Sequence, residues 1–142
     1  MNQITIKKID PSNILTILPL IKLLNENTAD HILKERVQEM STQNYECIGV
    51  YDREKLIGIS GLWFQTRHYS GRSVEPDHVI IYEVYRSQGI GKLLFDWIDQ
   101  YVISKGYEAI ELNTYVQNTA SHKFYYNEGY EILGFHFVKK LN

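Results

Sequence analysis

The chain has 142 residues, of which 44% are hydrophobic and 23% are charged, and its formal net charge is −2. This length suits one domain spanning residues 1–142, with a core large enough to fold without disulfides or a structural metal. Nucleic-acid binding needs clustered Lys and Arg, whereas the basic pairs at residues 7–8 and 139–140 are isolated. We therefore expect no nucleic-acid partner.

Membrane spans, disulfides and metal sites are also disfavoured by the sequence. The longest apolar region, residues 14–24, is too short to cross a bilayer and is interrupted by Pro19 and Lys22, so we expect no membrane segment. Cys47 is the only cysteine, which excludes an intramolecular disulfide and fits a cytoplasmic protein with a buried thiol on a strand. The five histidines lack metal-ligand spacing, so we expect no metal site.

The N-terminal region predicts one strand and two helices. Residues 4–9 alternate apolar with polar side chains, as a half-buried strand does. Residues 13–25 and 29–40 follow as two helical segments. Because proline lacks an N–H and clashes with the preceding turn of a helix, Pro19 predicts a kink or a break in the first segment.

A β-hairpin and a loop are expected next. Residues 45–51 and 56–65 are strand-like, and the polar residues 52–55 between them form a turn. Residues 66–77 are mostly polar and contain Gly71 and Pro76. This composition predicts one long loop, and long loops in compact domains are often binding elements.

The pattern that follows is a strand, helix, strand crossover. Residues 79–82 are apolar without alternation, which is typical of a strand covered on both faces. Apolar residues then recur at helical spacing from Ile90 to residue 102, and Gly106 is expected to end that helix. Residues 109–116 are the next predicted strand, and a helix between two such strands is typical of parallel pairing.

The last elements are a short helix and a strand. The helix is predicted over residues 119–128, with Asn118 as its N-cap and Gly129 as its C-terminal stop. Residues 131–141 follow as the final strand.

A glycine-rich turn between the apolar strand and the long helix has the properties of a phosphate cradle. Residues 86–91 read Arg-x-x-Gly-x-Gly, and the N–H groups from Gln88 to Lys92 stand where the helix dipole favours an anion. The glycines, Gly89 and Gly91, let a ligand oxygen approach the main chain without a Cβ in the way.

Two better-known phosphate-binding motifs do not match this turn, because residues that they require are absent at the corresponding positions. A Walker A loop ending at Lys92 needs a glycine where Arg86 stands and Ser or Thr where Leu93 stands. A dinucleotide fingerprint starting at Gly89 needs a further glycine where Leu94 stands. Both nucleoside triphosphate hydrolysis and hydride transfer are therefore disfavoured.

The turn and a second motif together resemble the GNAT superfamily of N-acetyltransferases. The second motif reads Asn118-x-x-Ser121-x-x-Phe124-Tyr125-x-x-x-Gly129-Tyr130, and the order of predicted elements matches the family over nearly the whole chain. Residues 86–94 and 135–141 look most like the bacterial branch that acetylates small amines, including aminoalkylphosphonate and aminoglycoside acetyltransferases. The resemblance implies an α/β fold, in detail an α+β fold with a mixed sheet of about six to seven strands, about four flanking helices and splayed parallel central strands.

The resemblance also implies that the cosubstrate is acetyl-CoA and which residues bind it. The pyrophosphate is expected at the turn, at Arg86, Ser87, Gln88, Gly89, Ile90, Gly91 and Lys92. The pantetheine arm is expected to pair with the preceding strand at Ile80, Ile81, Tyr82 and Val84, and to meet the later helix at Asn118, Ser121, Phe124 and Tyr125. Two alternatives stay open: Arg86 anchors the turn through its own backbone, and Asn118 is only a helix cap.

Acetyl transfer to an amine requires a neutral nitrogen and a leaving thiolate. With an alkyl amine pKa of about 10.4, roughly one molecule in two thousand is neutral at pH 7, so a proton acceptor is useful. The family register makes Tyr125 the candidate acid for the thiolate, whereas Tyr126 beside it is expected to be structural. His122, which also matches the small-amine branch, is more often a packing or surface residue than a catalyst.

The identity of the base stays open among Glu75, Asp77 and His78. The small-amine branch commonly has an acidic residue where His78 stands, eight residues before the arginine of the turn. An imidazole accepts a proton near neutral pH, whereas either carboxylate binds the ammonium form and passes its proton to water. Period-two geometry puts Glu75 and Asp77 on one face and His78 on the other, and a bulge would reverse this.

The acceptor is expected to be a small-molecule amine. Its pocket would come from the first two helices and residues 66–77, with Trp63 and Tyr69 as candidate walls and Trp63 as a core residue the alternative. Two other functions stay open: acetylation of a protein N-terminus or lysine, and acyl-CoA binding by a regulatory module without turnover. The frequent dimers of the family make a homodimer possible.

Overall fold

A computed structural model describes residues 3–141. The chain forms two compact units, one up to Glu111 and one from Leu112 onward. The first unit is built on one five-stranded sheet in the order β1-β2-β3-β4-β5. The strands are β1 (Ile4–Lys8), β2 (Tyr45–Asp52), β3 (Lys55–Arg67), β4 (Gly71–Ile81) and β5 (Ala109–Ile110). Neighbouring strands are antiparallel except β4 and β5, which are parallel.

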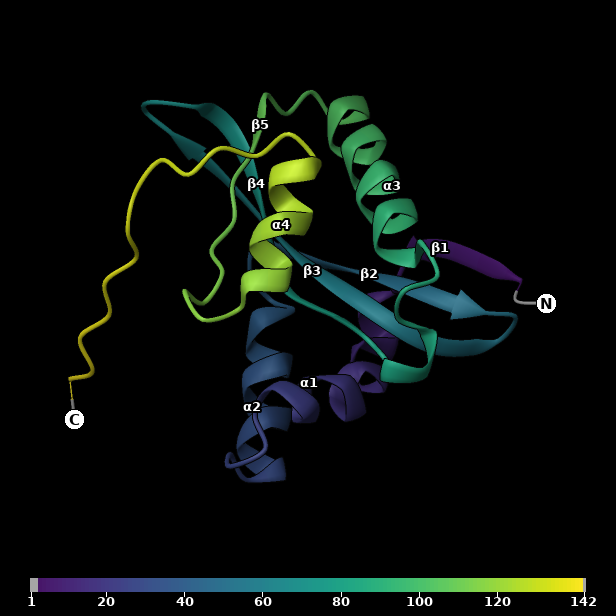
Figure 1. Cartoon of the computed structure of the whole chain (residues 1–142). Coiled ribbons are helices and arrows are strands. Elements are labelled where there is room, and N and C mark those ends of the chain that lie inside the picture. Colours follow the sequence, from purple (N-terminus) through teal and green to yellow (C-terminus); the bar gives the residue numbers. More distant parts are fainter. Residues whose placement is uncertain (1–2, 142) are drawn as a thin grey trace. The chain divides into compact units, whose positions relative to one another are not determined.

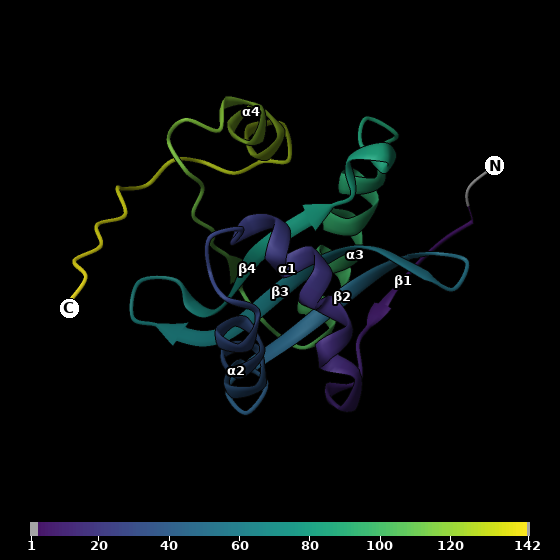
Figure 2. The same ribbon diagram turned by 90° about the horizontal axis from the view of Figure 1, so that it is seen from below.

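Helices cover both faces of this sheet (Figures 1 and 2). One face carries the 3-10 helix η1 (Pro11–Ile17), α1 (Leu18–Leu24) and α2 (Asp30–Met40), and the other carries α3 (Ile90–Ser104). Pro19 stands in the first turn of α1, where its missing N–H costs no helical hydrogen bond. The break predicted in the first helical segment is therefore confirmed.

Each face has its own hydrophobic core. On the α1 and α2 face, Ile17 and Leu20 pack with sheet residues such as Ile59. On the α3 face, Leu94 and Ile98 pack with side chains that the same strands direct the other way. The spacing predicted for residues 90–102 is confirmed in part, because Ile90, Leu94, Ile98 and Val102 are buried along α3. Leu93, which the same spacing places on this face, is 50% exposed.

The hairpin predicted at residues 52–55 is confirmed, with Asp52 paired to Lys55 across a two-residue turn. Cys47 is buried on β2, as expected, and burial raises the pKa of its thiol to about 12.

The long loop predicted over residues 66–77 is wrong. In the structure β3 extends to Arg67 and β4 begins at Gly71, so only residues 68–70 connect the two strands. Polar side chains are compatible with this hairpin because its end is exposed. Pro76 sits opposite Leu62 in the strand, beyond the point where β4 stops pairing with β5. Proline is tolerated in strands where its missing N–H leaves no ladder bond unmade.

The prediction of six to seven strands is also wrong, because the described residues form five. The strand expected over residues 109–116 is only β5, two residues long. Residues 131–141 alternate like a strand, but no partner strand pairs with them in the described chain, and a strand needs one.

The second unit contains one helix, α4 (Thr119–Asn127). Asn118 caps it, as predicted, and Gly129 follows it with a φ of 96°. Large apolar side chains of its C-terminal segment are exposed: Ile132, Leu133, Phe135, Phe137, Val138 and Leu141.

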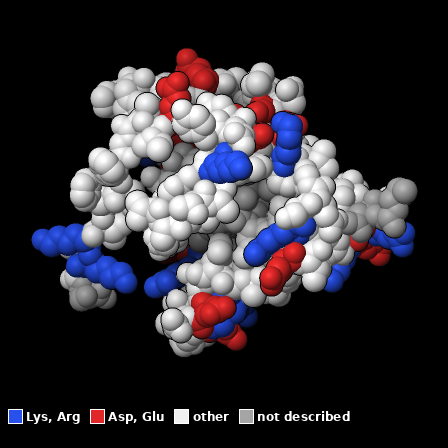
Figure 3. Space-filling model, viewed as in Figure 1, with Lys and Arg blue, Asp and Glu red and all other residues white. Residues whose placement is uncertain are grey.

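Two properties of the described surface and helices bear on function. On the face drawn in Figure 3, the coloured Lys and Arg side chains lie in small separate groups, with Asp and Glu close to several of them. Within residues 3–141, each helix is too short or too polar to cross a bilayer.

Candidate functional site

The glycine-rich turn leads directly into α3. Ser87 and Gly89 have φ angles of 60° and 78°, and the first helical bond joins the N–H of Leu93 to the carbonyl of Gly89 at 3.2 Å. No side chain caps this helix end in the described chain, and a Cβ placed on Gly89 would meet nothing within 4 Å. An anion can therefore approach the first turn of α3 at Gly89, which is the geometry that a diphosphate requires.

Arg86 holds the turn to the strand before it. Its Nε donates to the carbonyl oxygen of Ile81 at 3.1 Å, and Nε2 of Gln88 donates to the carbonyl oxygen of Val84 at 3.1 Å. Of the two roles open for Arg86, the backbone anchor is the one that this geometry contains.

The strand before the turn is shorter than the predicted pantetheine stretch. β4 ends at Ile81, and Tyr82 leads into a 3-10 turn, η2 (Glu83–Tyr85), in which Val84 is 78% exposed. Pairing of β4 with β5 stops at Val74. Within the described residues, the remainder of β4 pairs on one side only, with β3, and its other edge can accept an extended ligand.

A β-bulge in β4 brings two of the three base candidates together. The register with β3 shifts between Ile59 and Gly61, and His78 adopts a φ of 38°, which is unusual for a residue with a side chain. As a result, Asp77 and His78 both lie on the α1 and α2 face, where regular alternation would separate them.

Asp77 and His78, together with the residues that contact them, form a group that we call the Asp77 cluster: Tyr45, Gly61, Trp63, Asp77 and His78. Asp77 is its exposed member, with 51% of its side chain accessible. Its Oδ1 accepts the main-chain N–H of His78 at 2.8 Å, and its Oδ2 accepts the indole N–H of Trp63 at 3.0 Å. Nδ1 of His78 lies 3.5 Å from Oδ2. The interaction with the His78 imidazole lowers the pKa of Asp77 to about 2. The hydrogen bond from Trp63 also lowers this pKa, whereas burial of the carboxyl group opposes the shift.

His78 is held from behind by β2 and β3. Its Nε2 lies 2.6 Å from the hydroxyl of Tyr45, and 9% of its side chain is exposed. The Tyr45 ring packs against Trp63 and against His78 itself, at centroid distances of 4.8 and 5.6 Å. Gly61 makes room for the ring, because a Cβ there would overlap the imidazole.

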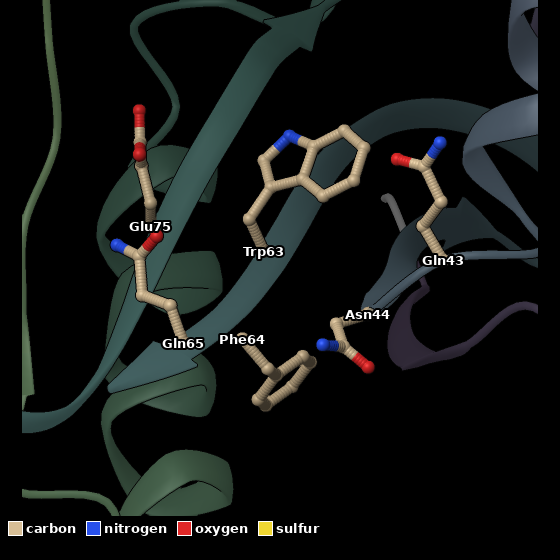
Figure 4. A pocket seen from close by; sticks show the side chains of 6 residues that line it. All are labelled: Gln43, Asn44, Trp63, Phe64, Gln65 and Glu75. Atoms are coloured by element: carbon tan, nitrogen blue, oxygen red, sulfur yellow. The ribbon is translucent and has the colours of Figure 1, made fainter. Parts of the chain in front are cut away.

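A pocket of about 460 Å³ opens beside this cluster. Figure 4 shows the side chains that line it: Gln43, Asn44, Trp63, Phe64, Gln65 and Glu75. Trp63 belongs to both the pocket and the Asp77 cluster, so the two are adjacent. The predicted wall Tyr69 is not part of it; its hydroxyl donates to Glu111 at 2.7 Å at the end of the hairpin.

The candidates of the second unit lie on or beside α4. Oδ1 of Asn118 accepts the N–H of Ser121 at 3.3 Å, so Asn118 serves as a helix cap. Tyr125 contacts the rings of Phe124 and Tyr130, and burial raises the pKa of its phenol. Nε2 of His122 lies 2.8 Å from the carbonyl oxygen of Tyr115.

The family model described as acetyltransferase (GNAT) family matches residues 17–130, well over half of the chain. The chain belongs to the GNAT acetyltransferase family. The matched residues include the turn, the parallel strands β4 and β5 and the motif on α4, and enzymes of this family use acetyl-CoA.

The names of proteins similar to this chain point to different acceptors. The chain is 30% identical over 88 residues to an aminoalkylphosphonate N-acetyltransferase of Salmonella typhimurium (strain LT2), a match that spans 61% of this chain and 57% of the relative. The structure resembles an aminoglycoside N-acetyltransferase, AAC(6')-Iy, solved in complex with CoA, with a TM-score of 0.85, 17% identity and coverage of 100% and 97% of the two chains.

A protein-modifying enzyme is similar too. The ribosomal-protein-alanine N-acetyltransferase of Brucella melitensis biovar Abortus 2308 matches with a TM-score of 0.82 and 16% identity, covering 99% of this chain and 100% of its own. At such identities the likeness shows the GNAT fold and leaves the acceptor open.

Two residues of the cluster had no signal in the sequence. Tyr45 is one of 11 tyrosines, and Gly61 lies inside an ordinary strand pattern. Only the pairing of β2, β3 and β4 shows that both contact His78.

For metals, no group of three or more His, Cys, Asp or Glu residues suited to an ion occurs between residues 3 and 141.

Proposed function

We propose that this acetyltransferase transfers the acetyl group of acetyl-CoA to a primary amine of a small molecule, by direct attack in a ternary complex. The observation that carries the proposal is the pocket beside Asp77, on the strand that leads into the amide turn of α3. One continuous segment thereby joins an acceptor site to a diphosphate site. Acetyl-CoA, when bound, supplies the thioester.

The residues of the turn fit a diphosphate by their main chain. Gly89 provides the positive φ and the open approach, and Arg86 fixes the turn to the carbonyl of Ile81. We assign the diphosphate to the N–H groups of residues 88–92 and the pantetheine arm to the one-sided edge of β4 before Ile81.

Asp77 is proposed as the anchor for the acceptor ammonium. It is ionised at neutral pH, half exposed and adjacent to the pocket. A carboxyl group with so low a pKa is a weak base, because a general base works best when its pKa is near the working pH. Glu75, which lines the pocket, and water therefore carry the proton away from the amine.

The bond changes are those of a simple acyl transfer. The neutral amine forms a bond to the acetyl carbon, the carbon–sulfur bond breaks, and the thiolate leaves with the bonding electrons. Tyr125 is the proposed proton donor to that thiolate, on the register of its motif. A phenol of ordinary pKa, about 10, is protonated near neutral pH, and burial raises the pKa of Tyr125 further.

The lining of the pocket favours a cationic acceptor without an anionic group. It offers the carboxylate of Glu75, the aromatic face of Trp63 and the carboxamides of Gln43, Asn44 and Gln65. Among the described residues that line it, none is Lys or Arg, which a phosphonate needs as a partner. Amino sugars and polyamines therefore fit this pocket better than aminoalkylphosphonates do.

A thiol-release screen tests this function. Acetyl-CoA is incubated with simple amines, polyamines, amino sugars, aminoalkylphosphonates and peptides with free N-termini or lysines, and free CoA thiol is measured. Release with cationic small amines supports the proposal. Release with peptides alone would move the acceptor to proteins, and saturable CoA binding without release for any acceptor would indicate a binding module.

A further inference from the structure

Three side chains from two strands form a series of polar contacts that ends beside the acceptor pocket. The Tyr45 hydroxyl lies 2.6 Å from Nε2 of His78, and Nδ1 of His78 lies 3.5 Å from Oδ2 of Asp77. The sequence motifs draw attention to Asp77 and His78 but not to Tyr45.

The contacts fix where the protons lie when the imidazole is neutral. The Asp77 carboxylate is ionised and can only accept, so the ring nitrogen that faces it, Nδ1, carries the hydrogen. A neutral imidazole has one donor and one acceptor, which makes Nε2 the acceptor and the Tyr45 hydroxyl its donor. The Tyr45 contact therefore selects the tautomer that points an N–H at Asp77.

Of the series Tyr45–His78–Asp77, only the Asp77 end is exposed to solvent. Tyr45 is 8% exposed and the His78 side chain 9%, whereas half of the Asp77 side chain is accessible. Because Nε2 already accepts from Tyr45, this lone pair is not available to an incoming ammonium. The end that an acceptor can reach is the Asp77 carboxylate.

The backbone conformation at His78 and the absence of a side chain at Gly61 place the imidazole between Tyr45 and Asp77. His78 occupies the left-handed region at φ 38°, a conformation that costs a residue with a side chain on the order of 1 kcal/mol. Gly61 leaves open the volume that the imidazole fills. A conformation of this cost persists only where surrounding contacts determine it, and the contact of His78 with Tyr45 is one of them.

We propose that Tyr45 is a positioning residue that acts through His78, fixing the imidazole so that its Nδ1–H holds the Asp77 carboxylate toward the acceptor amine. The proposal rests on the proposed function for its kinetic consequence, but the assignment of the tautomer does not depend on it.

The first test is spectroscopic and needs no substrate. Nitrogen-15 labelled full-length protein is studied by two-bond proton–nitrogen correlation at a pH where the imidazole is neutral, with His78 assigned by comparison with His78→Ala. We expect Nδ1–H for His78, and a changed Nε2 chemical shift in Tyr45→Phe, which keeps the ring and removes the hydroxyl. A wild-type Nε2–H tautomer, or an unchanged shift in Tyr45→Phe, would overturn the assignment.

The second test is a double-mutant cycle on acceptor turnover. Tyr45→Phe should lower kcat/KM for the amine about tenfold, the usual scale of a lost hydrogen bond, with unchanged affinity for acetyl-CoA. In a His78→Ala background the same change should have no further effect, because the partner is absent. Equal losses in both backgrounds, or no loss in either, would show that Tyr45 does not act through His78.

Tyr101→Phe is the matched control, since its hydroxyl bonds Glu46 on the other face of the sheet at 2.5 Å. It should lower stability without changing the kinetics for the amine. If the wild-type enzyme acetylates no amine, the proposed function fails while the tautomer is still measured. If it is active and Tyr45→Phe is equally active, the positioning role fails alone.

Discussion

The turn at residues 86–92 and the cluster around Asp77 lie on one continuous segment but are built from different parts of the peptide. The diphosphate site proposed at the turn uses main-chain N–H groups, and it requires glycine for its backbone angle and for an approach free of a Cβ. The cluster uses side chains from β2, β3 and β4, each held by another. A main-chain site tolerates most side-chain changes around it, whereas a side-chain cluster depends on every member. Mutations in the turn should therefore change the affinity for acetyl-CoA, and mutations in the cluster should change the kinetics for the amine.

The largest effect is expected at Asp77. Asp77→Asn removes the charge that meets the acceptor ammonium, and hydrogen bonds to charged groups imply a loss of about a hundredfold in kcat/KM for the amine. Affinity for acetyl-CoA, measured by calorimetry, should stay the same. Glu54→Gln, in the exposed turn between β2 and β3, is the control and should change neither. A loss confined to acetyl-CoA affinity would contradict the division between the two regions.

Gly61→Ala should disturb the packing of the same cluster. Its Cβ would overlap the His78 imidazole, and overpacking of this kind costs about 2 kcal/mol of unfolding free energy. Urea unfolding measures this loss, and the KM for the amine should rise as His78 is displaced. Gly134→Ala, where a Cβ meets nothing within 4 Å, is the matched control. Full stability and activity in Gly61→Ala would mean that the imidazole does not occupy this position.

Tyr125→Phe tests the proposed acid of the second unit. Because a thiolate is already a fair leaving group, removing its proton donor should lower kcat about tenfold, less than acid catalysis often contributes. Steady-state rates and acetyl-CoA affinity are measured together, and affinity should change little. Tyr126→Phe, one residue on and 71% exposed, should keep the full rate. Equal rates for both variants would remove Tyr125 from the mechanism.

Gly89→Ala probes the main-chain site. Gly89 and Gly106 flank α3 with φ angles of 78° and 79°, so Ala strains the backbone alike at both. Only at Gly89 does the added Cβ face the approach of a diphosphate. We expect about a fivefold weaker Kd for CoA in Gly89→Ala, the effect of roughly 1 kcal/mol, and none in Gly106→Ala. The same affinity in both variants would count against the cradle.

The smallest effect concerns acid stability. The folded-state pKa of Asp77 is about 2, below its ordinary value of 3.8, so its contribution is present above about pH 4 and lost as pH falls toward 2. Because half of the side chain is exposed, we expect about 1 kcal/mol rather than the full linkage value. Urea unfolding of wild type and Asp77→Asn should differ at pH 5 and converge near pH 2. A difference that grows on acidification would reverse the sign.

The same contrast explains what the sequence could predict. The turn can be predicted because Gly89 and Gly91 follow a strand and precede a periodic helix, and all of this information is local in the sequence. The cluster depends on a bulge that sets His78 beside Tyr45, 33 residues away. Local patterns carry no trace of such a contact, so the base candidates could be named but not arranged.

The two errors in the fold have a related cause. The polar composition of residues 66–77 predicts a loop, but strands at an exposed hairpin end need few apolar side chains. Residues 131–141 alternate as strands do, and their strand is not seen because no described segment pairs with it. Alternation gives a segment the capacity to form a strand, and the partner decides whether it does.

A crystal structure of the enzyme with coenzyme A tests the central claim most directly. We expect diphosphate oxygens within hydrogen-bonding distance of the main-chain N–H groups of residues 88–92, with Arg86 still bonded to the carbonyl oxygen of Ile81. A diphosphate bound elsewhere, or a turn whose N–H groups face away from it, would contradict the account.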